Sequence, residues 1–168
     1  MNVRLVIIGG VAGGATAAAR ARRLDEEAEI ILFERGDYIS FANCGLPYYI
    51  GEIIKERESL LVTNAKDFRK RYRIDVRISS EVIAIDRKNR EVEAKDLKTG
   101  EVYKEAYDKL IISPGAEPVS PPVQGIELNR IFNLRNIPDS ELIKAYVDNN
   151  KPGSAVIVGG GFIGLEMA

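Results

Sequence analysis

The sequence predicts an α/β fold with a doubly wound parallel sheet and an inserted antiparallel β-meander. Glycine-rich turns follow short apolar runs at residues 3–8 and 155–158, and each turn leads into a helix-forming segment. Continuous apolar runs of this length, rich in β-branched residues, are typical of parallel strands buried on both faces. Three shorter strand-like runs lie between them, at 82–86, 91–95 and 101–104. Turn residues separate these three runs, which indicates the meander.

The first glycine-rich turn predicts a dinucleotide site. Residues 9–14 read Gly-Gly-Val-Ala-Gly-Gly, and an alanine-rich segment at 15–24 follows as a strong helix former. A second strand at 29–33 leads into Glu34, about 20 residues beyond the turn, where an acid can bind ribose hydroxyls. The turn departs from the G-x-G-x-x-G pattern because Val11 occupies the second glycine position. The alternative is an ordinary β-α-β unit without a ligand.

The helix after this turn carries three polar residues on one face. Thr16, Arg20 and Arg23 are spaced i, i+4 and i+7, so their side chains can point in the same direction. Two aligned guanidinium groups can clamp a phosphate. A solvated edge of an otherwise apolar helix is the alternative, and helical spacing alone favours it at least as much.

The only cysteine of the chain lies in residues 40–49, Ser-Phe-Ala-Asn-Cys-Gly-Leu-Pro-Tyr-Tyr. Pro47 suits the first turn of a helix, and Ser40 and Asn43 could cap the free N–H groups there. A sulfur atom at a helix N-terminus is stabilised as the thiolate, so Cys44 is predicted to be reactive. The alternative is a small buried residue without chemistry. One cysteine excludes an internal disulfide, and with no histidine the chain offers no imidazole for proton transfer.

Helix and strand patterns alternate again after the cysteine segment. Thr63 is expected to cap a helix at 65–72, and a strand is expected at 74–77. The basic run at 69–73 is interpreted as a solvated helix face that a phosphate-bearing ligand could also use. Beyond the meander, residues 107–112 return to the buried parallel pattern.

The next segment predicts a crossover. Prolines stiffen residues 117–125, which show no periodicity. A short strand is expected at 131–134, and Asp139 or Ser140 is expected to cap a helix that ends near residues 149–150.

The end of the chain holds a second dinucleotide-binding fingerprint. It is a complete G-x-G-x-x-G pattern made by Gly159, Gly161 and Gly164, so two nucleotide cofactors are expected. The chain stops in the first turns of the helix that follows, and we therefore expect an N-terminal part of a longer protein. The expected divisions are the N-terminal half of a first nucleotide domain, a crossover segment with a strand and a helix, and the incomplete start of a second nucleotide domain, at 1–115, 116–153 and 154–168 respectively.

Charge and hydropathy exclude some partners. The chain has 24 basic and 25 acidic residues, interspersed, with a formal net charge of −1, so it offers no electrostatic case for nucleic-acid binding. The apolar N-terminal run is too short for a signal peptide or a membrane span. A single cysteine suits a reducing cytosol.

With both fingerprints and the segment Ser-Phe-Ala-Asn-Cys-x-Leu-Pro-Tyr at 40–48 in hand, the whole chain resembles the pyridine nucleotide-disulfide oxidoreductases with a single active cysteine. It looks most like coenzyme A disulfide reductases, coenzyme A-dependent persulfide reductases and NADH oxidases. The resemblance implies an FAD-binding Rossmann-like domain at the first fingerprint and the start of an NAD(P)H domain at Gly159, Gly161 and Gly164. The FAD-contacting residues that it implies are Gly9, Gly10, Val11, Ala12, Gly13, Gly14, Glu34, Arg35, Glu81, Val82, Ser113, Pro114 and Gly115. The residues that it implies for the coenzyme A channel are Thr16, Arg20, Arg23, Ser40, Asn43 and one of Arg71 or Tyr72.

The resemblance also implies a reaction. NAD(P)H would reduce FAD, and electrons would pass to a mixed disulfide between Cys44 and coenzyme A, with Ser40 and Asn43 beside the sulfur as catalytic residues. Free Cys44 thiolate would then attack a new small-molecule disulfide or persulfide. Coenzyme A is the exchanging thiol in this scheme, because no resolving cysteine is nearby. A cytoplasmic homodimer with no membrane and no nucleic-acid partner is the implied setting.

Two rivals stay open. Within the family, oxygen or peroxide reduction would cycle Cys44 through a sulfenic acid. NADH peroxidase-like members carry a histidine where this chain has Ala12, and their cysteine segment lacks the Asn and Leu-Pro found here, so an oxidase is the stronger form of this rival. From another class, the chain could be a non-catalytic nucleotide-binding module with an inert Cys44.

Overall fold

The computed structural model describes residues 2–168, which divide into two compact units. Among these residues the first unit comprises 2–41 and Leu61–Gly115, and the second comprises Ala42–Leu60 and Ala116–Ala168. The chain therefore leaves the first unit after Phe41, returns at Leu61, and leaves it again after Gly115.

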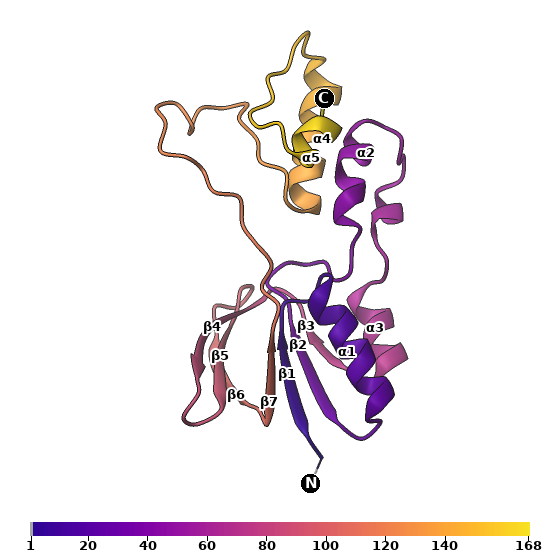
Figure 1. Ribbon diagram of the computed structural model, residues 1–168, viewed down its shortest axis with the longest axis vertical. Coiled ribbons are helices and arrows are strands. Elements are labelled where there is room, and N and C mark those ends of the chain that lie inside the picture. Colours follow the sequence, from indigo (N-terminus) through magenta and orange to yellow (C-terminus); the bar gives the residue numbers. More distant parts are fainter. Residues whose placement is uncertain (1) are drawn as a thin grey trace. The chain divides into compact units, whose positions relative to one another are not determined.

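A four-stranded parallel sheet forms the centre of the first unit, with the strand order β3-β2-β1-β7 (Figure 1). The strands are β1 (Arg4–Ile8), β2 (Glu29–Phe33), β3 (Asp75–Arg77) and β7 (Lys109–Ile112). The two central strands are buried along most of their length, which explains the unbroken apolar runs of the sequence. All four strands predicted for this sheet are confirmed.

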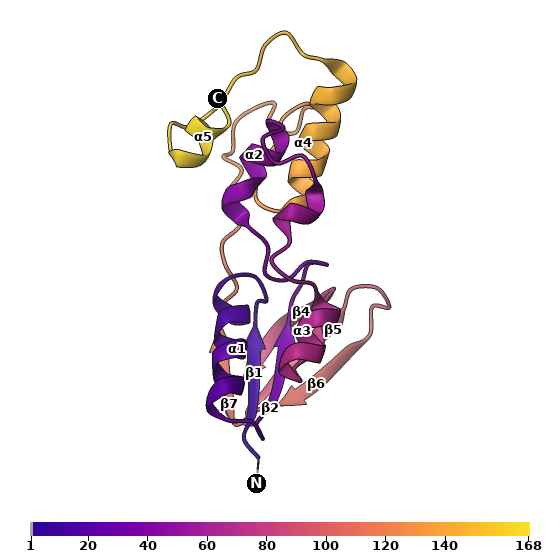
Figure 2. The same cartoon turned by 90° about the vertical axis from the view of Figure 1, so that its right-hand side faces the viewer.

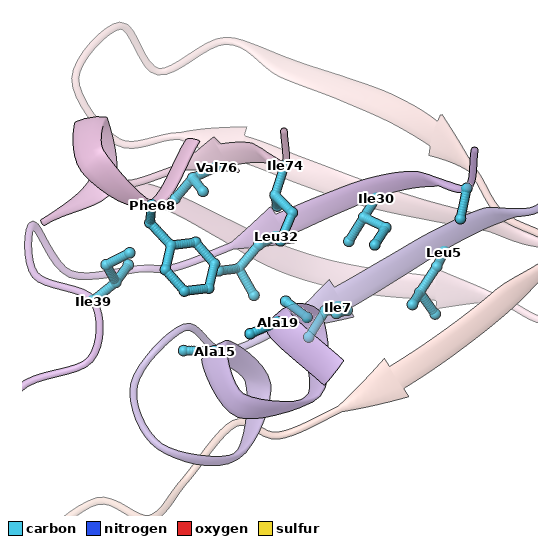
Figure 3. Close-up of a cluster of buried hydrophobic side chains, with 12 residues drawn as sticks. Leu5, Ile7, Ala15, Ala19, Ile30, Leu32, Ile39, Phe68, Ile74 and Val76 are labelled. Atoms are coloured by element: carbon cyan, nitrogen blue, oxygen red, sulfur yellow. The ribbon is translucent and has the colours of Figure 1, made fainter. Parts of the chain in front are cut away.

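Helices α1 (Gly13–Leu24) and α3 (Ala65–Tyr72) cover one face of this sheet (Figures 1 and 2). Helix α1 contributes small side chains, so it can pack close to the strands. Figure 3 shows Ala15 and Ala19 of α1 facing Ile7 and Leu32 of the sheet, with Phe68 of α3 completing the cluster. Ile7 and Leu32 are fully buried. This cluster fixes α1 against the sheet and so sets the position of the glycine turn before it.

The other face of the sheet is covered by the meander and not by helices. Strands β4 (Ser80–Asp86), β5 (Glu91–Asp96) and β6 (Val102–Ala106) pair antiparallel in the order β4-β5-β6. Val92 and Ala94 of β5 are fully buried against apolar residues of β1 and β2. The expected meander is therefore confirmed, and it is the layer that makes the central strands buried on both faces.

The second unit is helical in its regular part. Its elements are η1 (Asn43–Gly45), α2 (Leu46–Ile50), η2 (Arg57–Leu60), α4 (Ile137–Asn150) and α5 (Phe162–Glu166). Helix α2 packs against α4, and two ion pairs join α4 to residues that follow α2 in the sequence. Arg57 Nε donates to Glu141 Oε1 at 2.6 Å, and Lys144 Nζ lies 3.0 Å from Glu52 Oε1.

Two predicted strands do not form. Residues 131–134 and 155–158 carry strand-like sequences, but neither is a strand in the structure. A β-strand needs a hydrogen-bonded neighbour, and within residues 2–168 none lies beside either segment. Val156 and Val158 are accordingly 89% and 95% exposed. Apolar, β-branched composition alone was an insufficient signal there.

Two predicted helix caps are also wrong, although both helices form. Asn64 caps α3, accepting a hydrogen bond from the Asp67 N–H, whereas the predicted cap Thr63 lies one residue earlier. Asn136 caps α4 in a reciprocal capping box with Asp139, so Asp139 occupies the third helical position and is not the cap. In the part of the chain that the structure describes, no helix is both long and apolar enough to cross a membrane.

Candidate functional site

Two glycines, one in the turn after β1 and one at the start of α1, could not be replaced by any other residue without strain. Gly9 has a φ of +92°, and a Cβ there would lie 2.0 Å from the carbonyl oxygen of Ser113. A Cβ on Gly14 would lie 1.7 Å from the carbonyl oxygen of Gly9. The turn is therefore pressed between the start of α1 and the end of β7, and side chains are excluded from its inner surface.

The N-terminus of α1 keeps its capacity to bind an anion. Ala12 is the N-cap and has no side-chain capping bond, and the first turn holds no acidic residue among those described. The first N–H groups of a helix have no partner within the helix, and the helix dipole adds partial positive charge there. A pyrophosphate is the kind of group that this arrangement binds.

Glu34 stands at the end of β2, beside this turn. Its Oε2 accepts a hydrogen bond of 2.7 Å from the Gly10 N–H, and its Oε1 accepts one of 2.7 Å from the Gly36 N–H. Its backbone is held as well, because its N–H donates to Arg77 O at 2.8 Å and its carbonyl accepts from the Ser80 N–H at 3.0 Å. An ionised carboxylate has about four acceptor positions, so Glu34 retains capacity for two ribose hydroxyls.

Most residues predicted to contact FAD lie at one edge of the sheet in the first unit. The Ser113 N–H donates to Ile8 O at 2.8 Å, which places the segment after β7 beside the turn after β1. Glu81 and Val82 are half-buried at the start of β4, directly after Ser80, and Arg35 is exposed beside Glu34. This edge is where the parallel strands end, and ligands of such sheets bind outside the carboxyl ends of the strands.

Four of the residues predicted for coenzyme A lie on the two helices of the first unit. Thr16, Arg20 and Arg23 are all exposed on α1, which agrees with a shared solvent-facing side. Arg71 is exposed on α3, with its guanidinium carbon 5.3 Å from the centroid of the Tyr72 ring. The four side chains are thus available to a ligand in solution.

Cys44 belongs to the second unit and is exposed within η1, directly before α2. The residues after it are tightly packed: Leu46 is 2% exposed, and a Cβ on Gly45 would lie 2.9 Å from Leu60 Cδ2. Packing therefore fixes residues 45–47 and leaves the sulfur accessible. An accessible thiol on a fixed turn can reach a disulfide bond of a small molecule.

The predicted capping of this helix by Ser40 or Asn43 is wrong. The N-cap of α2 is Gly45, and no side chain of the described chain caps it. Asn43 lies in η1 and is exposed. Ser40 lies in the first unit, where its φ is +47° and its N–H donates to Gly10 O at 3.1 Å. Pro47 does lie in the first turn of α2, as predicted.

The second glycine turn repeats the geometry of the first. Gly159 has a φ of +111°, and a Cβ on Gly164 would lie 2.1 Å from the Gly159 carbonyl oxygen. Gly9 and Gly14, also five residues apart, show the same close approach. Gly161 is the N-cap of α5, with no side-chain cap among the described residues. The second turn therefore has the form of a nucleotide turn although the run before it is not a strand.

Sequence reasoning missed three residues around these sites. Gly36 and Ser80 hold Glu34 in place by hydrogen bonds from their backbone N–H groups. A pattern of side chains in the sequence does not predict hydrogen bonds of this kind. Arg22 is 9% exposed on the inner side of α1. Its signal was present in the sequence, because Arg22 follows Ala15, Ala18 and Ala19 at helical spacing and so shares their buried face.

The fold and the two turns define an α/β protein of the dinucleotide-binding class. The chain belongs to the pyridine nucleotide-disulphide oxidoreductase family, whose model matches residues 3–168. It is 42% identical over 164 residues to a coenzyme A disulfide reductase of Staphylococcus haemolyticus, covering 98% of this chain and 37% of the relative. The family resemblance seen in the sequence is thereby confirmed.

Two solved structures are similar to the chain over nearly its whole length. One is reduced CoADR-RHD of Bacillus anthracis, at 54% identity and a TM-score of 0.97, covering 99% of this chain and 30% of that one. The other is an NAD-dependent persulfide reductase from A. fulgidus, at 37% identity and a TM-score of 0.93, covering 98% and 30%. The predicted fold class agrees with these structures. The chain spans about a third of the length of the proteins that it matches.

Proposed function

We propose that the protein is an FAD-dependent NAD(P)H oxidoreductase that reduces coenzyme A disulfide or a coenzyme A persulfide through Cys44. The observation that carries the proposal is an exposed lone thiol on a packed turn, in a chain with two glycine turns of nucleotide-binding form. The matched reductases named for coenzyme A disulfide and persulfide substrates support the same chemistry. In this scheme residues 1–115 belong to the FAD domain, 116–153 form the crossover, and 154–168 begin the NAD(P)H domain.

The residues of the first unit fit a bound FAD. The uncapped N-terminus of α1 would hold the pyrophosphate, and Glu34 would bind ribose hydroxyls with its remaining acceptor positions. The further contacts that we propose come from residues 9–14, Arg35, Glu81, Val82 and residues 113–115. Gly159, Gly161 and Gly164 would receive NAD(P)H. Bound FAD would supply electron transfer from the nicotinamide to sulfur.

Cys44 would carry the exchange chemistry. Its thiolate attacks one sulfur of coenzyme A disulfide, a new S–S bond forms between Cys44 and one coenzyme A, and the other departs as a thiolate. Two electrons and a proton then cleave the mixed disulfide, which releases the second coenzyme A as a thiol and restores the Cys44 thiolate. Since Cys44 is the only cysteine in these 168 residues, the exchanging thiol in this scheme comes from coenzyme A.

Exposed side chains of the first unit would receive the substrate. Thr16, Arg20, Arg23 and Arg71 would bind the phosphates, because guanidinium groups match phosphate geometry. We also assign Ser40 and Asn43 to coenzyme A, on the family resemblance alone. We place the full-length protein in the cytoplasm as a homodimer, in keeping with the family resemblance and with a free thiol that needs a reducing compartment.

The proposal is tested by anaerobic NAD(P)H oxidation in the full-length protein with coenzyme A disulfide or a coenzyme A persulfide. We expect turnover in the wild type and none in Cys44→Ser, with flavin content unchanged between the two. Turnover that survives in the serine variant would remove Cys44 from the mechanism. Oxidation that begins only when air is admitted would instead assign an NADH oxidase.

A further inference from the structure

Arg22 is a buried arginine that joins the ends of the two helices of the first unit. Its Nε donates to Tyr72 O at 2.8 Å and its Nη2 to Arg73 O at 2.9 Å, both at the end of α3. Its Nη1 donates to Glu26 O at 2.7 Å and to Asp25 O at 3.3 Å, just after α1. The side chain is 9% exposed. One guanidinium group thus binds four backbone carbonyls from two segments that are far apart in sequence.

The chemistry of these carbonyls explains why an arginine is needed. Tyr72 is the last residue of α3 and Arg73 is its C-cap, and carbonyls at a helix C-terminus lack intrahelical partners and carry partial negative charge from the helix dipole. A guanidinium has five donors in a rigid plane, so it can satisfy several carbonyls at once, whereas lysine has a compact ammonium without a fixed plane. Arg73 adds a further hydrogen bond between the same two segments, because its own Nη2 donates to Glu26 O at 3.2 Å.

The hydrogen bonds of Arg22 lie next to two of the arginines proposed to bind coenzyme A. Arg23 directly follows Arg22 on α1, and Arg71 directly precedes Tyr72 on α3. Arg22, the neighbour of Arg23, therefore donates a hydrogen bond to the carbonyl of Tyr72, the neighbour of Arg71. Replacing Arg22 would remove these hydrogen bonds without altering the side chain of Arg23 or Arg71.

We propose that Arg22 is a positioning residue that sets the spacing of Arg20 and Arg23 on α1 relative to Arg71 on α3, so that all three can bind the phosphates of one ligand. This inference rests on the proposed function, since the same three cations are assigned there to coenzyme A. It adds a buried residue that never contacts the substrate and that determines selectivity for its phosphate-bearing end.

The first test compares two disulfide substrates in the full-length, flavin-loaded protein. Pantetheine disulfide has the reactive end of coenzyme A disulfide but lacks its phosphates and adenosine. We expect Arg22→Met to raise KM for coenzyme A disulfide about tenfold with kcat within about twofold, and to leave KM for pantetheine disulfide unchanged. Arg22→Lys should give a smaller rise in KM. Arg87→Met, which alters an exposed arginine in the meander, is the matched control and should resemble the wild type.

A second measurement separates this inference from the proposed function. Calorimetry gives the affinity of the proposed phosphate site for adenosine 3′,5′-bisphosphate and does not depend on turnover. Binding weakened about tenfold in Arg22→Met, and less in Arg22→Lys, supports the positioning role even if coenzyme A disulfide is not a substrate. Equal affinity in the wild type and in both variants overturns it, as does a wild type that binds no bisphosphate. Should Arg22→Met fail to fold, Arg22→Lys decides by the same criterion.

Discussion

The backbone N–H of Gly10 donates a 2.7 Å hydrogen bond to Oε2 of Glu34. The second oxygen of the same carboxylate accepts from the Gly36 N–H, also at 2.7 Å. Glu34 therefore joins the turn after β1 to the turn after β2. The acid that is proposed to bind ribose also preorganises the glycine turn that is proposed to bind pyrophosphate.

Replacing Glu34 should therefore destabilise the nucleotide-free protein. We expect Glu34→Ala to lower the free energy of unfolding by about 3 kcal/mol, because two charge-assisted hydrogen bonds are lost. Glu34→Gln should lose about half of that, since its amide presents one acceptor oxygen. Urea unfolding of the protein stripped of nucleotide measures both. Glu27→Gln, at an exposed position, is the control, and a Glu34→Ala variant as stable as this control would contradict the expectation.

The close approach of Gly14 to Gly9 makes a second prediction. An alanine at position 14 would place its Cβ 1.7 Å from the Gly9 carbonyl oxygen, so the turn must shift. We expect Gly14→Ala to lower the free energy of unfolding by about 2 kcal/mol and to reduce the flavin content of the purified full-length protein. Visible flavin absorbance relative to protein measures the second effect. Gly153→Ala, where a Cβ meets nothing within 4 Å, should leave both unchanged.

Much of the first unit was predictable because its signals are local. Four parallel strands, both helices and the meander follow from apolar runs, glycine turns and turn residues in the sequence. The failures at residues 131–134 and 155–158 have one cause. A strand exists only with a neighbour, and a neighbour is a property of the fold that composition does not report.

The site shows the same division between local and long-range information. That Thr16, Arg20 and Arg23 share one face followed from helical spacing alone, and the structure shows this face to be exposed. The bonds from Glu34 to Gly10 and Gly36 could not be predicted, because they depend on where two turns meet in space. Arg22 falls between these cases: its spacing from the alanines placed it on the buried face, but its four carbonyl partners come from folding.

The accessible sulfur makes a third prediction. Because Cys44 is exposed on a turn held by buried neighbours, one equivalent of iodoacetamide should modify it in the native full-length protein. A reactive cysteine should alkylate at neutral pH at least about tenfold faster than a free model thiol. Mass spectrometry of the peptide containing Cys44 gives the rate, with Cys44→Ser as the blank. A rate equal to or below that of the model thiol would favour the inert, non-catalytic module.

The capping box of α4 predicts how the second unit is stabilised. Asn136 Oδ1 accepts from the Asp139 N–H at 2.9 Å, and Asp139 Oδ2 accepts from the Asn136 N–H at 3.2 Å. Asn136→Ala should lower the free energy of unfolding by about 1 kcal/mol, because an N-cap bond is lost. Urea unfolding measures the change, and Asn136→Ser, which can still cap, should recover most of it. A serine variant no better than alanine would show that capping is not the cause.

Acid sensitivity of the meander is expected from the turn between β5 and β6. Asp96 Oδ1 accepts from the Thr99 N–H at 2.9 Å and from the Lys98 N–H at 2.8 Å. These hydrogen bonds, that of Thr99 foremost, lower the pKa of Asp96 below its usual value. A carboxylate whose pKa is lower in the folded state contributes stability above its unfolded pKa, near 4, and loses that contribution as the pH falls through the folded value.

The urea midpoint should therefore fall between about pH 6 and about pH 3, and Asp96→Asn should reduce this fall, because asparagine keeps an acceptor oxygen but does not titrate. Glu127→Gln, at an exposed position outside the meander, is the control and should leave the pH dependence as in the wild type. An Asp96→Asn variant with the full wild-type dependence would assign the acid sensitivity to other carboxylates. A reduced dependence would show that the ionised Asp96 carboxylate stabilises the folded protein through its hydrogen bonds in the turn between β5 and β6.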